Sequence, residues 1–66
     1  MTREDALNIL SAKGILGPDA ETSLNAALKG FASIDEMLAE AKTMSVDGVL
    51  RWFGQDGARV LLALGA

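Results

Sequence analysis

Residues 45–64 read SVDGVLRWFGQDGARVLLAL and contain the single Trp of the chain, Trp52, together with its densest run of aliphatic side chains. Within this stretch the apolar residues at i, i+3, i+4 and i+7 have the spacing of one face of an α-helix; they are Val46, Val49, Leu50 and Phe53. We expect a helix here whose four apolar side chains face the interior. The rest of the chain is expected to pack around it.

Local signals divide this stretch into two helices. Ser45 precedes the first apolar residue, where its hydroxyl can accept a hydrogen bond from a backbone N–H of the first turn. Gly54 follows the apolar face and suits the left-handed end of a helix, and Asp56 is the expected cap of the next helix. Asp47-Gly48 and Asp56-Gly57 indicate an alternative, because Asp-Gly pairs also occur in tight turns.

The second of these helices is apolar on more than one side. Val60, Leu61 and Leu64 form its main stripe, and Leu62 adds a second face. A helix that is apolar nearly all round needs cover from more than one direction.

The residues before this stretch predict three more helices. Thr2 with Asp5, and Ser33 with Glu36, have the spacing of capping boxes that begin a helix, and Pro18 suits the first turn of another. The expected helix ends are Gly14 and Gly30. The expected apolar faces comprise Ala6, Leu7, Leu10, Ala20, Leu24, Ala27, Leu28, Phe31, Ile34, Met37, Leu38 and Ala41.

These helices account for nearly all of the 66 residues and leave no room for a sheet. Helices of about ten residues cannot form the long seams of a regular bundle. The sequence therefore predicts an all-α fold, a single compact domain over residues 1–66 with four or five short helices that do not form a regular bundle.

The residue types that most enzymes use for catalysis are scarce. The chain has no Cys, no His and no Tyr, so the usual nucleophiles, general bases and soft metal ligands are missing. Glu36 and Glu40 share a helix face and could act as a carboxylate pair, but charge on the outer side of an amphipathic helix is ordinarily solvated. We expect no enzyme, no catalytic residue, no metal site and no cofactor.

Charge and hydropathy limit the kinds of partner. The formal net charge is −3, whereas a nucleic-acid binder needs a basic face to neutralise phosphates. The longest apolar run, Val60 to Leu64, is far shorter than the ~20 residues of a membrane span, and acids stand where a signal peptide would be basic. We expect a cytoplasmic protein, a complete small reading frame starting at Met1, that contacts neither nucleic acid nor membrane directly.

Two groups of residues are candidates for binding a partner. Asp35, Glu36 and Glu40, together with Glu21, would form an acidic patch that meets a basic groove on a larger protein. The structural alternative is that acids near helix starts cap the helix and interact favourably with its dipole, each contributing roughly 0.3–1 kcal/mol.

Arg51 and Trp52 form the second group, because Arg and Trp are enriched at the energetic centres of interfaces. If Val49, Leu50 and Phe53 define the buried face, Trp52 lies on its flank and Arg51 on the solvent side. We expect Trp52 to form the edge of the core, as the largest apolar side chain of a small domain. A direct contact with a partner is the alternative.

One stretch of the chain resembles part of the peptidoglycan-binding helical repeat. It reads Gly14-Ile15-Leu16-Gly17-Pro18, followed by Thr22 and Leu24-Asn25. That family has a Gly-x-x-Gly-Pro turn that leads into a short helix. Here Asp19-Ala20-Glu21 separate Pro18 from Thr22, whereas the family's Thr follows the Pro almost at once. The resemblance implies a divergent peptidoglycan-binding module as one alternative function.

In size, acidic balance, lack of catalytic residue types and irregular helical layout, the chain resembles the small stand-alone inhibitors that phages and mobile elements encode, the anti-CRISPR proteins among them. The resemblance implies stoichiometric binding to a larger host protein or protein–nucleic-acid complex. We expect a monomer or a weak homo-oligomer. A structural or assembly subunit that self-associates through its apolar C-terminal helix is the alternative.

Overall fold

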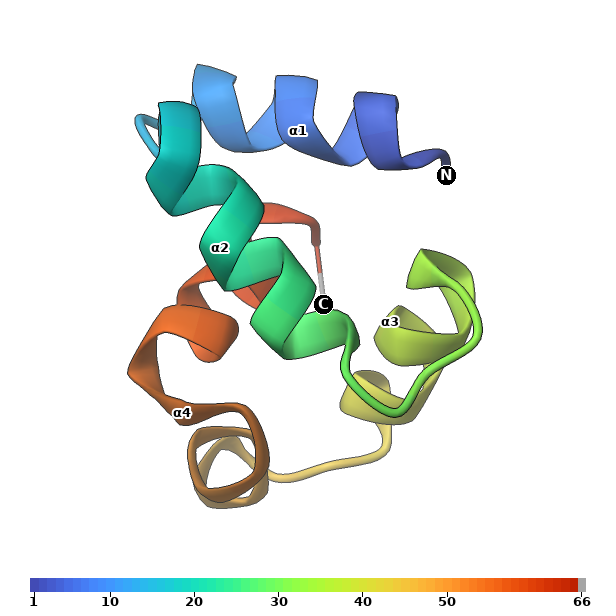
Figure 1. The fold of residues 1–66 in the computed structure, drawn as a ribbon. Coiled ribbons are helices and arrows are strands. Elements are labelled where there is room, and N and C mark those ends of the chain that lie inside the picture. The colour runs from blue at the N-terminus through green and yellow to red at the C-terminus, as the bar shows by residue number, and fades with distance from the viewer. Residues whose placement is uncertain (66) are drawn as a thin grey trace.

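Residues 1–65 fold into four helices joined by short links. A computed structural model describes residues 1–65, which form α1 (Arg3–Ala12), α2 (Gly17–Leu28), α3 (Ile34–Lys42) and α4 (Val46–Ala63), and the described residues include no strand. Helix α2 packs mainly against α4, with α1 across one side of this pair and α3 on another (Figure 1). The all-α prediction is confirmed, and the helices do not run parallel as in a regular bundle.

Short-range side-chain hydrogen bonds cap the starts of three helices, α1, α3 and α4, as the sequence indicates. At α1, Thr2 Oγ1 accepts from the Asp5 N–H at 3.1 Å, and the Asp5 carboxylate accepts from the Thr2 N–H at 3.4 Å. At α3, Ser33 Oγ accepts from the Glu36 N–H. The Glu36 carboxylate reaches the N–H of Ala32, one residue before the cap, so the second capping box is only half formed.

The first helix ends in the way its glycine predicts. Gly14 has a φ of 88°. Its N–H donates to the Ser11 carbonyl at 3.1 Å, and the Ile15 N–H donates to the Leu10 carbonyl at 2.9 Å. These two bonds are those of a Schellman motif, in which the left-handed residue lets the chain satisfy carbonyls of the last turn.

Helix α4 is two helices that meet at Gly54, as the sequence predicts. Gly54 has φ 75° and ψ 178°, the one non-helical conformation within α4, and the chain changes direction there (Figure 1). Ser45 caps the first half, accepting from the Gly48 N–H at 3.1 Å. The prediction for Asp56 is wrong, because the second half is already helical at Gln55 and Asp56 lies inside its first turn.

The Asp-Gly turn alternative is also wrong. Asp47-Gly48 and Asp56-Gly57 both lie inside α4. Gly57 is buried, and a Cβ added to it would lie 2.7 Å from the Cβ of Phe53. Gly57 therefore forms no turn. Because it has no side chain, it lets the two halves of α4 approach each other closely.

The core receives side chains from all four helices. Its largest fully buried members are Leu10, Leu24, Met37, Val60 and Leu61, one or two from each helix. The predicted inner faces of α1, α2 and α3 are confirmed, since every buried side chain of these helices belongs to them. At the edge of the core the rings of Phe31 and Phe53 stack with their centres 5.9 Å apart.

The predicted inner face of the first half of α4 is half wrong. Val49 and Phe53 are partly buried, but Val46 is 76% exposed and Leu50 is 43% exposed. Apolar spacing identifies one face of a helix, but only a neighbouring element can bury it. Here the core contacts one edge of the face, and the edge with Val46 and Leu50 is left open.

Candidate functional site

The open edge of α4 borders an apolar groove of about 480 Å³. Eight of its nine lining residues are apolar, and Lys42 is the charged one; the lining residues are Ala41, Lys42, Met44, Val46, Val49, Leu50, Ala58, Leu61 and Leu62. We call it the α3–α4 groove, because these residues come from the end of α3, the link that follows it and both halves of α4.

The groove has a buried floor and an exposed rim. Ala41, Ala58 and Leu61 are buried and form the floor. Two floor residues are alanines, whose small side chains leave the space above them unfilled. Val46, Leu50 and Leu62 form the rim, and Leu62 is 72% exposed.

The break at Gly54 gives the groove its two walls. Without it, α4 would continue in one direction and the residues after position 54 would lie beyond those before it. The change of direction brings Ala58 and Leu62 to the same groove as Val46 and Leu50. The groove therefore depends on one glycine conformation.

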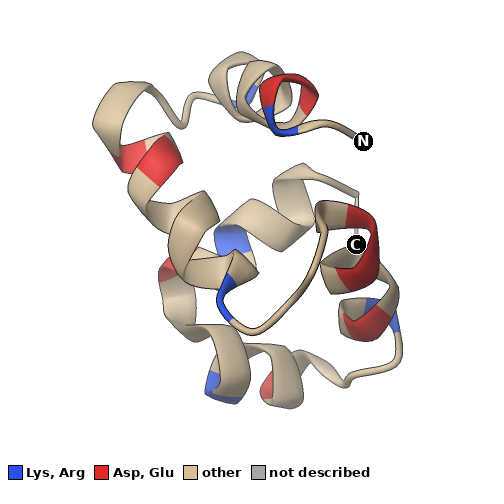
Figure 2. Ribbon diagram, turned by 45° about the vertical axis from the view of Figure 1, so that its right-hand side comes forward, with Lys and Arg blue, Asp and Glu red and all other residues tan. Residues whose placement is uncertain are grey.

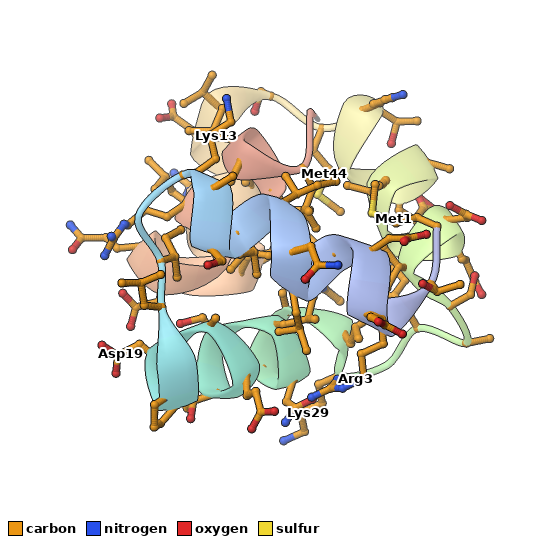
Figure 3. All side chains as sticks on the ribbon, turned by 90° about the horizontal axis from the view of Figure 1, so that it is seen from above. Met1, Arg3, Lys13, Asp19, Lys29 and Met44 are labelled. Carbon is orange, nitrogen blue, oxygen red and sulfur yellow. The ribbon has the colours of Figure 1, made fainter. Side chains whose placement is uncertain are left out.

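The structure gives structural roles to two of the predicted acidic site residues. The Asp35 carboxylate lies 3.0 Å from the amino group of Met1, and Figure 3 shows Met1 beside α3. The Glu36 carboxylate accepts the N–H of Ala32 at 3.1 Å. Glu40 lies one turn after Glu36 on the same exposed side of α3. The three acids thus share one helix.

Glu21 is not brought together with these three. It lies near the start of α2, and the end of α2 is the part that leads into α3. Figure 2 shows the acidic residues of α2 well separated from those of α3. The predicted patch is therefore an α3 surface of Asp35, Glu36 and Glu40 without Glu21.

Arg51 and Trp52 are both exposed and neither lines the groove. The prediction that Trp52 forms the edge of the core is wrong, since Trp52 is 68% exposed. It lies two residues after Leu50, hence about 200° around the helix, on the flank away from the groove. Phe53 occupies the core edge there by stacking on Phe31.

A second, more polar hollow of about 350 Å³ lies between the start of α2 and the second half of α4. Its charged lining residues are Asp19, Asp56 and Arg59, and Arg59 Nη1 lies 4.0 Å from the Asp56 carboxylate. Within residues 1–65, no group of three or more His, Cys, Asp or Glu side chains is placed to hold a metal ion.

The sequence contains a signal for the groove but not its position. The second half of α4 has apolar residues on two faces, and one neighbouring helix cannot bury both. In the structure Leu62 stays exposed. The contribution of Val46 and Leu50 depends on where α3 ends and where α4 turns, which no local pattern specifies.

No helix in the described part of the chain is both long enough and apolar enough to cross a membrane. Comparison with known proteins gives no relative for this chain: no family model matches it, and neither does any curated protein or solved structure.

Proposed function

We propose that this protein acts without catalysis, by binding stoichiometrically to a larger protein. The observation that supports the proposal best is the α3–α4 groove. Three apolar side chains stand exposed around a floor that is already buried. A contiguous exposed apolar surface is a recognised mark of protein-binding sites.

The proposal takes a more specific form as an inhibitor of a nucleic-acid-handling complex in the cytoplasm. Helix α3 carries Asp35, Glu36 and Glu40 on its exposed side, and its last turn lines the groove. An acidic surface on the same helix as part of an apolar anchor suits a partner that has a basic nucleic-acid channel near an apolar site. The acids would speed and orient association, while the groove would supply most of the affinity.

The proposal is tested by capture of partners from an extract of the source cells. We expect the immobilised protein to retain one partner in a constant ratio, and we expect the variant Leu62→Lys to lose it. Leu16→Lys is the matched control, because Leu16 is 59% exposed and lies outside the groove. Failure to retain any partner at low salt, or equal retention by Leu62→Lys, would contradict the proposal.

The inhibitor form has its own test. Adding the protein to the captured partner at a one-to-one ratio should reduce the partner's binding of nucleic acid. If a saturating amount of the protein leaves the partner's binding of nucleic acid unchanged, the protein binds this partner but does not inhibit it in this way.

Self-association is the second candidate, and the exposure of Leu62 on the second half of α4 favours it. Two copies would then associate through the exposed surface around Leu62. Sedimentation distinguishes the two functions: a monomer at micromolar concentration disfavours self-association, and a dimer that Leu62→Lys dissociates supports it.

A further inference from the structure

We infer that the α3–α4 groove binds a single amphipathic helix of the partner, which inserts three apolar side chains and places an acidic residue beside Lys42. The inference rests on the proposed function and specifies the chemistry of the partner's contact.

The volume of the groove determines how many side chains it takes. A cavity of about 150 Å³ lined by apolar side chains accommodates one benzene ring. The groove measures about 480 Å³, which corresponds to about three ring-sized or leucine-sized groups. A helix laid along a groove presents its apolar side chains at i, i+3 or i+4, and i+7, so three such groups correspond to one face of two helical turns.

The size of the groove favours a helix over a second copy of this chain. A standard interface between globular proteins involves about 20–30 residues and about 800 Å² on each side. The groove has nine lining residues, and 800 Å² would be roughly a fifth of the 4249 Å² surface of the whole chain. A two-turn helical face matches nine residues, whereas a globular copy needs far more.

The positions of the other exposed apolar residues also favour a helix over a second copy of this chain. A concave groove needs a convex apolar ridge, and the exposed large apolar residues outside the groove are Met1, Leu16 and Trp52. These lie before α1, in the link before α2 and on the far flank of α4, so they form no ridge. Pairing groove with groove would leave two hollows facing each other, which loses the close packing that stabilises interfaces.

Lys42 indicates the charge of the helix that binds. Among residues 1–65 it is the one charged residue that lines the groove, and Glu40, two residues earlier, points about 200° away around α3. An incoming helix at this end therefore meets the Lys42 cation among the lining residues, and no acidic side chain lines the described groove. An Asp or Glu at the edge of its apolar face would pair with Lys42, whereas a Lys or Arg there would be repelled.

The test uses peptides of about 16 residues, roughly four helical turns, selected from a random phage-displayed library against the folded protein. We expect the selected sequences to share three apolar residues at helical spacing and an adjacent acid. Measured by fluorescence anisotropy, Leu50→Lys and Leu62→Lys should each weaken binding of a selected peptide by at least about tenfold. The control Leu16→Lys should leave its affinity unchanged.

A charge exchange tests the contact with Lys42. Lys42→Glu should weaken binding of a selected peptide, and replacing the peptide's acid by Lys should restore binding to this variant only. Because the rescue needs both changes together, it reports a direct pairing and not a general effect of charge.

Selected peptides without helical spacing, or binding that is insensitive to Leu50→Lys and Leu62→Lys, would overturn the inference. So would a dimer that occupies the groove, detected by sedimentation and dissociated by Leu62→Lys. The proposed function fails separately: if extracts yield a partner that Leu62→Lys loses but no helical peptide is selected, only the inference falls. If helical peptides bind the groove and extracts yield no partner, only the proposed function falls.

Discussion

Replacing Gly54 with the two mirror forms of alanine tests the break in α4. Gly54 has φ 75° and ψ 178°, a region that only glycine among the natural residues occupies readily, and an L-residue held there costs on the order of 1–3 kcal/mol. A Cβ at this position would meet no atom within 4 Å. The whole cost of Gly54→Ala is therefore backbone strain, without a steric clash.

D-alanine should have the opposite effect. For a D-residue this backbone is the mirror image of an extended L-conformation, which is freely allowed. By restricting the unfolded chain, the added methyl group should stabilise the fold by about 0.4–1 kcal/mol. The two variants restrict the unfolded chain equally, so they should differ by the backbone strain alone, about 1–3 kcal/mol.

Total chemical synthesis gives access to both variants, and circular dichroism during heating and urea titration measures their stability. At this chain length 1 kcal/mol shifts the melting temperature by about 4–8 °C. L-alanine should therefore lower the melting temperature and D-alanine should raise it by a few degrees. If the two variants melt together, or if L-alanine is tolerated without loss, α4 does not break at Gly54 and the groove does not have the walls described above.

Three further predictions concern other parts of the fold. Leu24→Ala removes a fully buried side chain of α2 and should cost about 2–5 kcal/mol, enough to leave much of a small domain unfolded in a urea titration; a loss below 1 kcal/mol would contradict its place in the core. Ser33→Ala removes the oxygen that accepts the Glu36 N–H at 3.1 Å and should cost about 1 kcal/mol, whereas Ser11→Ala, on the exposed side of α1, should cost far less in the same titration. Because Trp52 is 68% exposed, its fluorescence maximum should shift little on unfolding, and a blue-shifted folded spectrum would place it in the core.

The sequence predicted the helices well because their ends depend on local chemistry. Thr2 and Ser45 each bond to an N–H three residues ahead, and Gly14 and Gly54 both have positive φ. Interactions over three or four residues can be read from spacing alone. The error at Asp56 is equally local: the second half of α4 begins directly after the non-helical Gly54, one residue before Asp56.

The burial of α4 could not be predicted in the same way. Val46, Leu50 and Leu62 have the spacing of buried residues, yet they are exposed because no neighbouring helix extends over them. Their exposure depends on the length of α3 and on the angle at Gly54, which are properties of the assembled fold. For the same reason the sequence placed Glu21 with Asp35, although α2 holds it near the other end of the molecule.

The central claim is that the rim of the α3–α4 groove contributes to binding and not to folding. Urea unfolding of the double variant Leu50→Lys/Leu62→Lys tests it most directly, since both side chains belong to apolar stripes that would ordinarily be assigned to the core. We predict that the free energy of unfolding falls by less than about 1 kcal/mol, as for other surface substitutions. A loss of about 2 kcal/mol or more for each leucine, typical of buried positions, would contradict the claim.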